Sequence, residues 1–478
     1  MLRKLARNIF VALAGTTTQK AMAFATTLVL ARGLGREGFG IYSFVGVYIF
    51  FFAFLVDLGM ERVVTRALAE SPQRIGRLLG NALILKLVLA AVAVPAAYVV
   101  ALLMHVSGEV QYCILLAALG LPLSVDLLFR SYFQSQYQVH YIYLITLPGS
   151  IMFLLLAALC VHWSLPVHAI FYVGLLNAGF VLALLLWIAV PRVRLSLRPE
   201  LWLMRELLRD AGEVGLFVLL FILAMRIDQI LLFELSGAGE VGRYAVAVKV
   251  TEALSILPEA LMMTVFPLLA ASRNSAAERF EQTYRLSFKY LSAIILPVAL
   301  LLTVLRGEFV ALAFGPQYSS SAAPLAILAW SMFFAYAGAV YLNLIIVEHR
   351  QRLLVLVSAV AVAVNIGLNV WLIPIYGATG AAWATLISNA VGFACWLVHP
   401  YSARFIVTCM RQATRPLVGV AAGFVVAAVL PVTGLGAAGA ALAVYGAVMA
   451  VSGGFSRSDL ILLRQVLADR AAEPVGSR

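Results

Sequence analysis

The sequence predicts an all-α polytopic membrane protein, and three observations support this prediction. The 478 residues are 63% hydrophobic and only 12% charged, whereas a soluble domain carries about 25% charged residues. The mean hydropathy is +0.99. Apolar runs of about 20 residues, the length that a membrane-spanning helix needs, recur along the whole chain. The segments between these runs are short and leave no room for a soluble catalytic domain.

The apolar runs predict about 14 transmembrane helices. They cover residues 8–31, 39–57, 79–104, 110–133, 141–161, 169–190, 212–233, 244–269, 286–305, 322–347, 353–374, 378–398, 416–430 and 434–451. The last two runs are short and rich in Ala and Gly, so a re-entrant pair is an alternative for them. The N-terminus begins like a signal peptide but continues without a clean cleavage site, which favours a retained first span.

The distribution of basic residues supports this order of spans. With the N-terminus placed in the cytoplasm, most of the 34 Lys and Arg residues fall in inside segments. The outside segments hold only Arg32, Arg36, Arg243 and Arg306. Cytoplasmic loops of membrane proteins carry an excess of Lys and Arg, so both termini are predicted to be cytoplasmic.

An internal repeat divides the chain. The stretch LARGLGREGFGIY at residues 30–42 aligns with LFELSGAGEVGRY at residues 232–244, so that Gly35 corresponds to Gly237 and Gly40 to Gly242. Each copy ends one predicted span and begins the next through an outside turn. Spans 1 and 7 are therefore equivalent and share one orientation, as in parallel-repeat transporters.

The repeat and the span order predict five segments. These are an N-terminal lobe of six helices (1–190), a cytoplasmic linker (191–211), a second six-helix lobe (212–398), two further spans (399–451) and a cytoplasmic tail (452–478). From Pro199 onward the linker alternates basic and apolar residues. This pattern is typical of an amphipathic helix that lies on the inner leaflet.

Charge and cysteine content exclude several other classes. The formal net charge is +12, which in a soluble protein would suggest nucleic acid. Here the basic residues lie mostly in short loops, so anionic lipid headgroups are the expected partners and nucleic acid is not. The four cysteines have no CxxC or metal-ligand spacing and are expected to be small buried residues. They are Cys113, Cys160, Cys395 and Cys409.

Four stretches together resemble a known family. They are LARGLGREGFGIYSF near the start, RIDQILLFELSGAGEVGRYAVAVKVTEAL in the middle, FGPQYSSSAAPLAILAWSMFF at residues 314–334 and LNVWLIPIYGATGAAWATLISNA at residues 368–390. In this order and spacing they resemble the polysaccharide-exporter branch of the MOP superfamily, the Wzx-type oligosaccharide-lipid flippases. The resemblance covers nearly the whole chain.

The resemblance implies two pseudo-symmetric six-helix lobes around a central cationic cavity, plus two C-terminal helices. It implies a transporter, not an enzyme, that works by alternating access in the bacterial cytoplasmic membrane. The implied substrate is an undecaprenyl-diphosphate-linked oligosaccharide, such as an O-antigen or exopolysaccharide unit, moved from the inner to the outer leaflet. The expected protein is a monomer without metal or cofactor, with membrane lipids and glycan polymerase or assembly proteins as partners. Coupling to H⁺, to Na⁺ or to the membrane potential stays open.

Charges inside the predicted spans mark the candidate site. A charge near the bilayer centre costs at least ~2.5–3.5 kcal/mol, so such residues usually face protein, water or a substrate path. Arg226 in span 7 and Lys20 in span 1 lie at similar depth on helices that the repeat makes equivalent. Guanidinium and ammonium groups bind phosphate oxygens, so both are predicted to bind the diphosphate. The alternative is an internal ion pair of Arg226 with Asp228 or Glu252.

The other charges of this region were assigned by helical spacing. Asp228 points about 200° away from Arg226 on a helix, which leaves a pair with Lys249, a coupling cation or a proton as its partner; the pair with Lys249 is preferred. Lys249, Glu252 and Glu259 share one helix face. Lys249 is predicted to contact the substrate. Glu252 and Glu259 are predicted to form structural or coupling-ion contacts.

Two further sets complete the predicted site. Gln19 lies beside Lys20 and is expected to contact the substrate. Lys86 and Asp126 are expected to pair with each other across spans 3 and 4, or to line the inner mouth of the cavity. Lys86 is counted among the substrate-binding residues, and Asp126 among the coupling or structural carboxylates.

Three rival functions were compared with the flippase. A multidrug exporter of the same superfamily should have an acidic, apolar cavity, which the in-span Lys and Arg residues argue against. A membrane glycan polymerase or ligase needs a large outside loop with reactive Arg or His residues, and the outside loops here are short. A scaffold without transport leaves the cations within the spans unexplained.

Overall fold

The structure is a computed structural model that describes residues 2–193, 195–259, 277–347, 351–397, 400–431 and 433–454. This part of the chain is helical and contains no β-strand. Nine stretches of it are long and apolar enough to cross a membrane. The all-α membrane architecture is thereby confirmed, while the number of about 14 spans stays a prediction.

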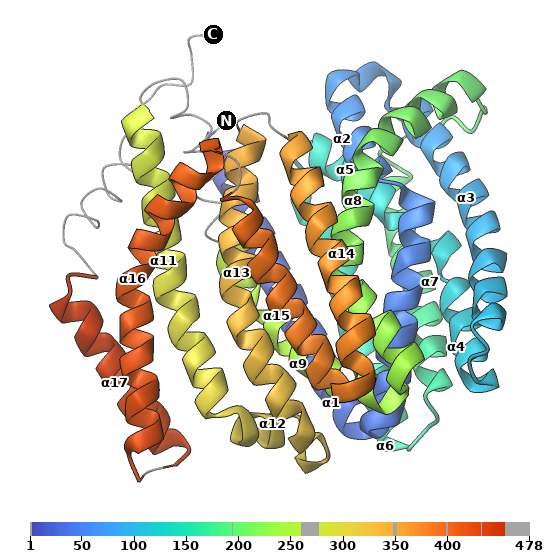
Figure 1. The fold of residues 1–478 in the computed structure, drawn as a ribbon. Coiled ribbons are helices and arrows are strands. Elements are labelled where there is room, and N and C mark those ends of the chain that lie inside the picture. The colour runs from blue at the N-terminus through green and yellow to red at the C-terminus, as the bar shows by residue number, and fades with distance from the viewer. Residues whose placement is uncertain are drawn as a thin grey trace. The chain divides into compact units, whose positions relative to one another are not determined.

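From α1 to α9, and again from α11 to α17, most of the described helices follow one another with short connections (Figure 1). In chain order they are α1 (Leu2–Asp57), α2 (Met60–Glu70), η1 (Pro72–Arg74), α3 (Ile75–Leu103), α4 (Gly108–Ala118), η2 (Leu121–Leu123), α5 (Asp126–Ser135), α6 (Val139–His162), α7 (His168–Ala189), α8 (Leu201–Ser236), α9 (Ala238–Leu254), α11 (Ala277–Val304), α12 (Arg306–Phe314), η3 (Pro316–Ser321), α13 (Ala322–Val347), α14 (Gln351–Tyr376), α15 (Ala378–Cys395), α16 (Pro400–Val429) and α17 (Leu435–Val451).

Internal contacts divide the chain into two compact units. The first comprises Met1–Ala253 with Asn369–Ala381, and the second comprises Leu254–Leu368 with Ala382–Arg478. The two predicted lobes (1–190 and 212–398) depend on the internal repeat and the order of the spans. A division by contacts does not test that symmetry, so the lobe boundaries stay predictions.

Two glycines bend the first unit at equivalent places. Gly35 interrupts α1 with a φ of 68° and a ψ of −177°. Gly237 ends α8 with a φ of 82° and a ψ of 175°. Residues with a Cβ rarely adopt a positive φ, so glycine is required at both turns. The two turns also adjoin, and the rings of Phe44 and Phe233 stack with their centroids 3.7 Å apart.

Helix α8 is longer than the sequence predicts. It is continuous from Leu201 to Ser236, so the amphipathic segment of the linker and span 7 form a single helix. No proline interrupts this stretch, and a lone glycine such as Gly212 costs only about 1 kcal/mol in a helix. At 1.5 Å per residue the helix is about 54 Å long, well beyond the roughly 30 Å of hydrocarbon.

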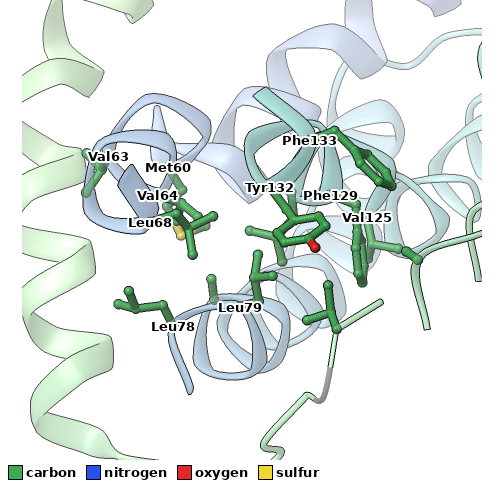
Figure 2. Packing of buried hydrophobic residues seen from close by; sticks show 14 of the residues in the cluster. Met60, Val63, Val64, Leu68, Leu78, Leu79, Val125, Phe129, Tyr132 and Phe133 are labelled. Atoms are coloured by element: carbon green, nitrogen blue, oxygen red, sulfur yellow. The ribbon is translucent and has the colours of Figure 1, made fainter. Parts of the chain in front are cut away.

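The apolar face of that segment packs on protein. Leu203, Leu207 and Ala211 are buried in a core with α2, α3 and α5. Figure 2 shows side chains of this core: Met60 and Leu68 from α2 and Tyr132 from α5 gather above Leu78 and Leu79 of α3. These apolar residues pack on neighbouring helices instead of remaining free for lipid, while the position of the segment at the inner leaflet stays a prediction.

Span 4 is broken in the structure. Helix α4 ends at Ala118, and α5 begins only at Asp126 after a short 3₁₀ turn that contains Pro122. Proline lacks the N–H that a helix needs and clashes with the preceding turn. The break directs the start of α5 toward α2, α3 and α6, the elements that surround the core shown in Figure 2.

In the second unit, α16 and α17 form a closely packed pair (Figure 1). A Cβ added to Gly423 would lie 2.7 Å from the carbonyl oxygen of Ala441, so small residues let the two backbones approach. The hydroxyl of Tyr445 donates a 2.7 Å hydrogen bond to the carbonyl of Ala293 in α11. Helix α16 begins at Pro400, earlier than the predicted start of span 13 at Pro416.

Candidate functional site

A polar cavity of about 400 Å³ lies within the first unit. Helix α1 supplies most of its wall, from both sides of the bend at Gly35, while α6, α7, α8 and α9 supply the rest. The lining residues are Gln19, Met22, Ala23, Thr26, Thr27, Tyr42, Ser43, Gly46, Val47, Phe50, Ser150, Phe153, Asn177, Arg226, Gln229 and Lys249. A volume of this size falls within the range of small-molecule sites. We call this feature the polar cavity.

Helical spacing selects the residues of α8 that face the polar cavity. Arg226 and Gln229 are three residues apart and both line it, because residues at this spacing share a helix face. Asp228 points elsewhere, is buried, and accepts a hydrogen bond from the hydroxyl of Tyr244. Its Oδ1 atom also accepts a 2.8 Å bond from the backbone N–H of Gln229.

Two cations of the cavity wall share one carboxylate. The guanidinium of Arg226 in α8 donates to Oε1 of Glu252 in α9. The ammonium of Lys249 donates to Oε2 of the same residue at 2.8 Å. Two positive charges and one negative charge leave this group with one net positive charge. The guanidinium also lies 5.8 Å from the ring centre of Phe50, within reach of a cation–π contact.

These contacts decide between the pairings that helical spacing left open. Arg226 pairs with Glu252, which is the internal ion pair considered as an alternative, and yet its side chain also lines the polar cavity. The preferred pair of Asp228 with Lys249 is wrong. Tyr244 and the backbone satisfy Asp228, and Glu252 lies one turn from Lys249 on the same helix, where it is the nearer carboxylate.

Another part of the cavity wall is polar without formal charge. Gln19 lines it and donates from Nε2 to Oγ1 of Thr146 at 2.5 Å. Thr26 and Thr27 donate to the carbonyls of Met22 and Ala23, in each case at 2.9 Å. Ser43, Ser150 and Asn177 complete this part of the wall.

Lys20, which follows Gln19 in α1, does not line the polar cavity in this structure. Its side chain is half-buried. A helix turns by about 100° per residue, so neighbours in sequence face different directions. Of the predicted cations, the structure therefore brings Arg226 and Lys249 together with Gln19, while Lys20 lies on an adjacent face.

Lys86 and Asp126 form two separate ion pairs. The Lys86 ammonium lies 2.7 Å from Oδ1 of Asp57, and the lysine side chain is only 3% exposed. Asp126 lies 3.4 Å from Arg130, one turn along α5. The predicted Lys86–Asp126 pair is wrong, because the break before α5 leaves Asp126 beside Arg130. Neither Lys86 nor Asp126 lines the polar cavity.

Glu259 belongs to the second unit and is exposed. Its Oε1 atom accepts a 3.1 Å hydrogen bond from the hydroxyl of Ser255. Residues 260–276, which include the end of predicted span 8, lie outside the described part of the chain. Within that part, no group of three or more His, Cys, Asp and Glu side chains is placed to hold a metal ion.

A second cavity, of about 300 Å³, lies between α2, α3 and the start of α8. Several of its charges are paired: Arg66 with Glu70 and Asp210 of the same wall, and Arg77 with Glu200, which lies outside the lining. The bond from Arg77 holds the pKa of the Glu200 carboxyl below its usual range. Such matched charges offer less to an anionic ligand than the cation-rich wall of the polar cavity.

Sequence reasoning missed the uncharged wall of the polar cavity. It ranked residues by charge, so Ser43, Ser150 and Asn177 received no role. One usable signal was present in α1. Gln19, Met22, Ala23, Thr26 and Thr27 recur at helical spacing along one face, and polar residues at such positions in an apolar helix indicate a face turned away from lipid.

Comparison with known proteins gives three findings. The family model described as "Polysaccharide biosynthesis protein" matches residues 5–273, more than half of the chain. "Probable flippase AglR" of Haloferax volcanii is 27% identical over 172 residues, which are 35% of this chain and 36% of that protein. "Uncharacterized membrane protein MJ1068" of Methanocaldococcus jannaschii is 23% identical over 206 residues, 40% of this chain and 39% of that protein. The matches thus span little more than a third of these relatives.

Two solved structures share the fold over most of the chain. "Lipid II flippase MurJ, inward closed conformation" superposes with a TM-score of 0.76 at 12% identity, covering 95% of this chain and 100% of that one. A multidrug resistance MATE family transporter of the MOP superfamily, in an inward-facing conformation, gives 0.64 at 17% identity, covering 83% and 94%. At such identities the likeness shows the fold alone, and it confirms the expected all-α membrane fold class. The two six-helix lobes, the number of spans and the central cationic cavity stay predictions.

Proposed function

The chain belongs to the polysaccharide biosynthesis protein family, and we propose that it is a flippase for an undecaprenyl-diphosphate-linked oligosaccharide. In this proposal the substrate moves from the inner to the outer leaflet of the bacterial cytoplasmic membrane, and both termini are cytoplasmic. The protein acts as a transporter without an enzymatic step. Its relation to a probable flippase and the flippase-like fold support this proposal.

One observation carries the proposal: Arg226 and Lys249 lie together on the wall of a cavity that is also lined by α1, α6 and α7, which are long and apolar enough to cross a membrane. A diphosphate cannot cross hydrocarbon unaided, because each unpaired polar group costs several kcal/mol there. Charge-assisted hydrogen bonds from guanidinium and ammonium groups replace water around the phosphate oxygens. The two cations therefore supply the chemistry that transfer of this head group requires.

Glu252 prepares the two cations for the diphosphate. Of the guanidinium nitrogens of Arg226, only Nη1 donates to Glu252 within the described residues, while a guanidinium carries five N–H donors in a fixed fork. In our proposal the other donors of the fork bind phosphate oxygens. The carboxylate holds both side chains in place before the substrate arrives, which lowers the entropy lost on binding. It also leaves the net positive charge small enough for the product to be released.

Energy for this transfer comes from the charge of the substrate. Outward movement of negative charge down an inside-negative potential is worth ~2.3 kcal/mol per charge per 100 mV. The two wall cations cancel part of this gain on the outward step, and the potential then favours return of the emptied cationic site. Our proposal includes no cofactor, and H⁺ or Na⁺ coupling is an addition that transport assays can detect.

Deletion of the gene in its native host tests this function. We expect a complete undecaprenyl-linked glycan to accumulate, protected from a probe or glycosidase added outside right-side-out vesicles. Complementation with the wild-type gene should restore exposure of the glycan on the outer leaflet. Normal glycan export together with raised sensitivity to cationic dyes would instead identify a multidrug exporter.

A further inference from the structure

Two oxygen atoms in the polar cavity have no hydrogen-bond partner within the described part of the chain. They are Oγ of Ser43 and Oδ1 of Asn177. Ser43 is only 7% exposed, and both residues line the cavity. Buried polar atoms in native proteins nearly always have a partner, so each exception requires an explanation. Each atom has almost no accessible surface in this structure, so a ligand in the cavity supplies the missing hydrogen bonds only when the two side chains rotate toward it.

The surroundings of these atoms define the ligand chemistry. The hydroxyls of Thr26, Thr27 and Ser150 donate their protons to backbone carbonyls of their own helices. A hydroxyl that has donated its proton still offers its oxygen lone pairs. Together with the side-chain oxygens of Ser43 and Asn177, this part of the wall presents uncharged acceptors. We call these five residues the neutral wall.

The neutral wall suits a sugar better than a phosphate. It has no formal positive charge, and the hydroxyls of both threonines and of Ser150 have already donated their protons, so an ionised phosphate oxygen, which only accepts, finds few donors there. The Ser43 hydroxyl and the Asn177 amide can both donate and accept, as sugar hydroxyls do. A sugar ring carries many O–H donors and also apolar C–H faces. The rings of Tyr42 and Phe153 line the same cavity and provide apolar surface for such a face.

The two sides of the cavity come from different helices. Arg226 and Lys249 belong to α8 and α9, while the neutral wall belongs to α1, α6 and α7. A molecule with a diphosphate joined directly to a sugar matches this division. Gly149 of α6 leaves room for the asparagine, because a Cβ added there would lie 3.1 Å from Oδ1 of Asn177.

We propose that the neutral wall is the subsite for the sugar attached to the diphosphate, and that Asn177 and Ser43 are its specificity-determining residues. Asn177 Oδ1 accepts a hydrogen bond from one sugar hydroxyl. The Ser43 hydroxyl forms a second hydrogen bond with the same sugar. This inference rests on the proposed flippase function. The added claim is that uncharged residues recognise the sugar part of the substrate.

Binding to purified full-length protein in lipid nanodiscs tests the subsite. The probes are undecaprenyl diphosphate alone and undecaprenyl diphosphate carrying one glucose, galactose or N-acetylglucosamine. We expect the wild type to bind at least one glycosylated probe more tightly than the bare carrier. Asn177→Ala and Ser43→Ala should lower the affinity for that glycosylated probe about five- to tenfold, which is about 1–1.4 kcal/mol. The affinity for the bare carrier should change by less than about twofold.

Stability separates recognition from a packing role. Because neither oxygen atom has a partner in the empty cavity, both alanine variants should keep or raise the melting temperature of the unliganded protein. Asn81→Ala is the matched control, because the Asn81 amide bonds the backbone of Arg77, Arg198 and Glu200 at 2.9, 3.3 and 2.7 Å. It should lower the melting temperature and leave the preference for the glycosylated probe unchanged.

Other outcomes overturn the inference in distinguishable ways. If Asn177→Ala lowers the affinity for bare and glycosylated probes equally, or lowers neither, that result excludes the sugar subsite. Equal affinity of the wild type for bare and glycosylated probes does the same and leaves the flippase proposal intact. Failure of Arg226→Ala to weaken the bare carrier instead removes the diphosphate site on which the proposed function depends.

Discussion

Gly40 and Gly242 contact each other reciprocally across the two halves of the internal repeat. A Cβ added to Gly40 would lie 1.8 Å from the carbonyl oxygen of Ala238, and one added to Gly242 would lie 2.0 Å from that of Arg36. In the repeat alignment Ala238 is the counterpart of Arg36, so each glycine meets the equivalent atom of the other copy. The repeat read from the sequence is therefore a symmetric contact in the fold.

The Gly40–Gly242 contact should tolerate no side chain. We expect Gly40→Ala and Gly242→Ala each to lower the free energy of unfolding by about 1–3 kcal/mol or more, as overpacking does, because the added methyl meets backbone that cannot move aside. Thermal unfolding of the purified protein measures this. Gly239→Ala, in the same turn, is the control: its nearest neighbour is 4.0 Å away, so equal loss of stability there would contradict the explanation.

Arg226 should matter for transport through its charge and its fork of donors. We expect Arg226→Ala to reduce glycan export and binding of undecaprenyl diphosphate at least tenfold, since a hydrogen bond to a charged group is worth about 1.5–3 kcal/mol. Arg226→Lys should retain part of the binding. Export assays normalised to protein level provide the measurement, with Lys20→Ala in parallel. Wild-type export by Arg226→Ala would remove Arg226 from the site, and lost export by Lys20→Ala would show that Lys20 contacts the substrate although it does not line the polar cavity in this structure.

Removal of the shared carboxylate should separate binding from stability. Glu252→Gln leaves the charges of Arg226 and Lys249 uncompensated. We expect tighter binding of undecaprenyl diphosphate, slower export, and a stability loss of about 1 kcal/mol, the upper value for partly exposed ion pairs. Weaker binding in this variant would mean that Glu252 orients the cations more than it neutralises them.

Lys86 should be a structural residue in the described fold. Its ammonium is bound to Asp57 and nearly inaccessible. We expect Lys86→Met to cost about 3–5 kcal/mol of stability, because the carboxylate keeps its charge without a partner. The double variant Lys86→Met with Asp57→Asn should recover much of the loss. Binding of undecaprenyl diphosphate per folded molecule should stay unchanged, and loss of that binding would restore Lys86 to the substrate site.

The contact of Arg77 with Glu200 should give a pH-dependent contribution. The pKa of Glu200 is depressed in the folded protein by the hydrogen bond from Arg77, so its contribution to stability exists above the carboxyl's ordinary pKa of 4.5 and disappears as the pH falls through the lower folded value. We expect Glu200→Gln to lower the melting temperature slightly at pH 7. That difference should begin to shrink as the pH falls below 4.5 and vanish only below the lower folded pKa, whereas a constant difference would indicate an effect unrelated to charge.

Most of the fold was predictable because its signals are local. Predicted span 10 and helix α13 have identical bounds, Ala322–Val347, since a long apolar run between polar turns admits one helix. The prediction that separated the linker from span 7 was wrong, since nothing in residues 201–236 breaks a helix. The site was predictable only in part. Hydropathy identified Arg226 and Lys249 as charged residues within apolar runs. It gave no signal for Asn177 or Ser43, whose short polar side chains are common in membrane helices.

The sequence by itself determined that this protein is a helical membrane protein with an internal repeat and cations inside its spans. These properties depend on composition and on spacing along one helix. Only the tertiary structure decided which charges meet: Arg226 and Lys249 share Glu252, Asp228 bonds Tyr244, and Lys86 pairs with Asp57. The reason is geometric, because the partner of a buried charge depends on how neighbouring helices are rotated and cross. Side-chain packing along their whole length sets those angles.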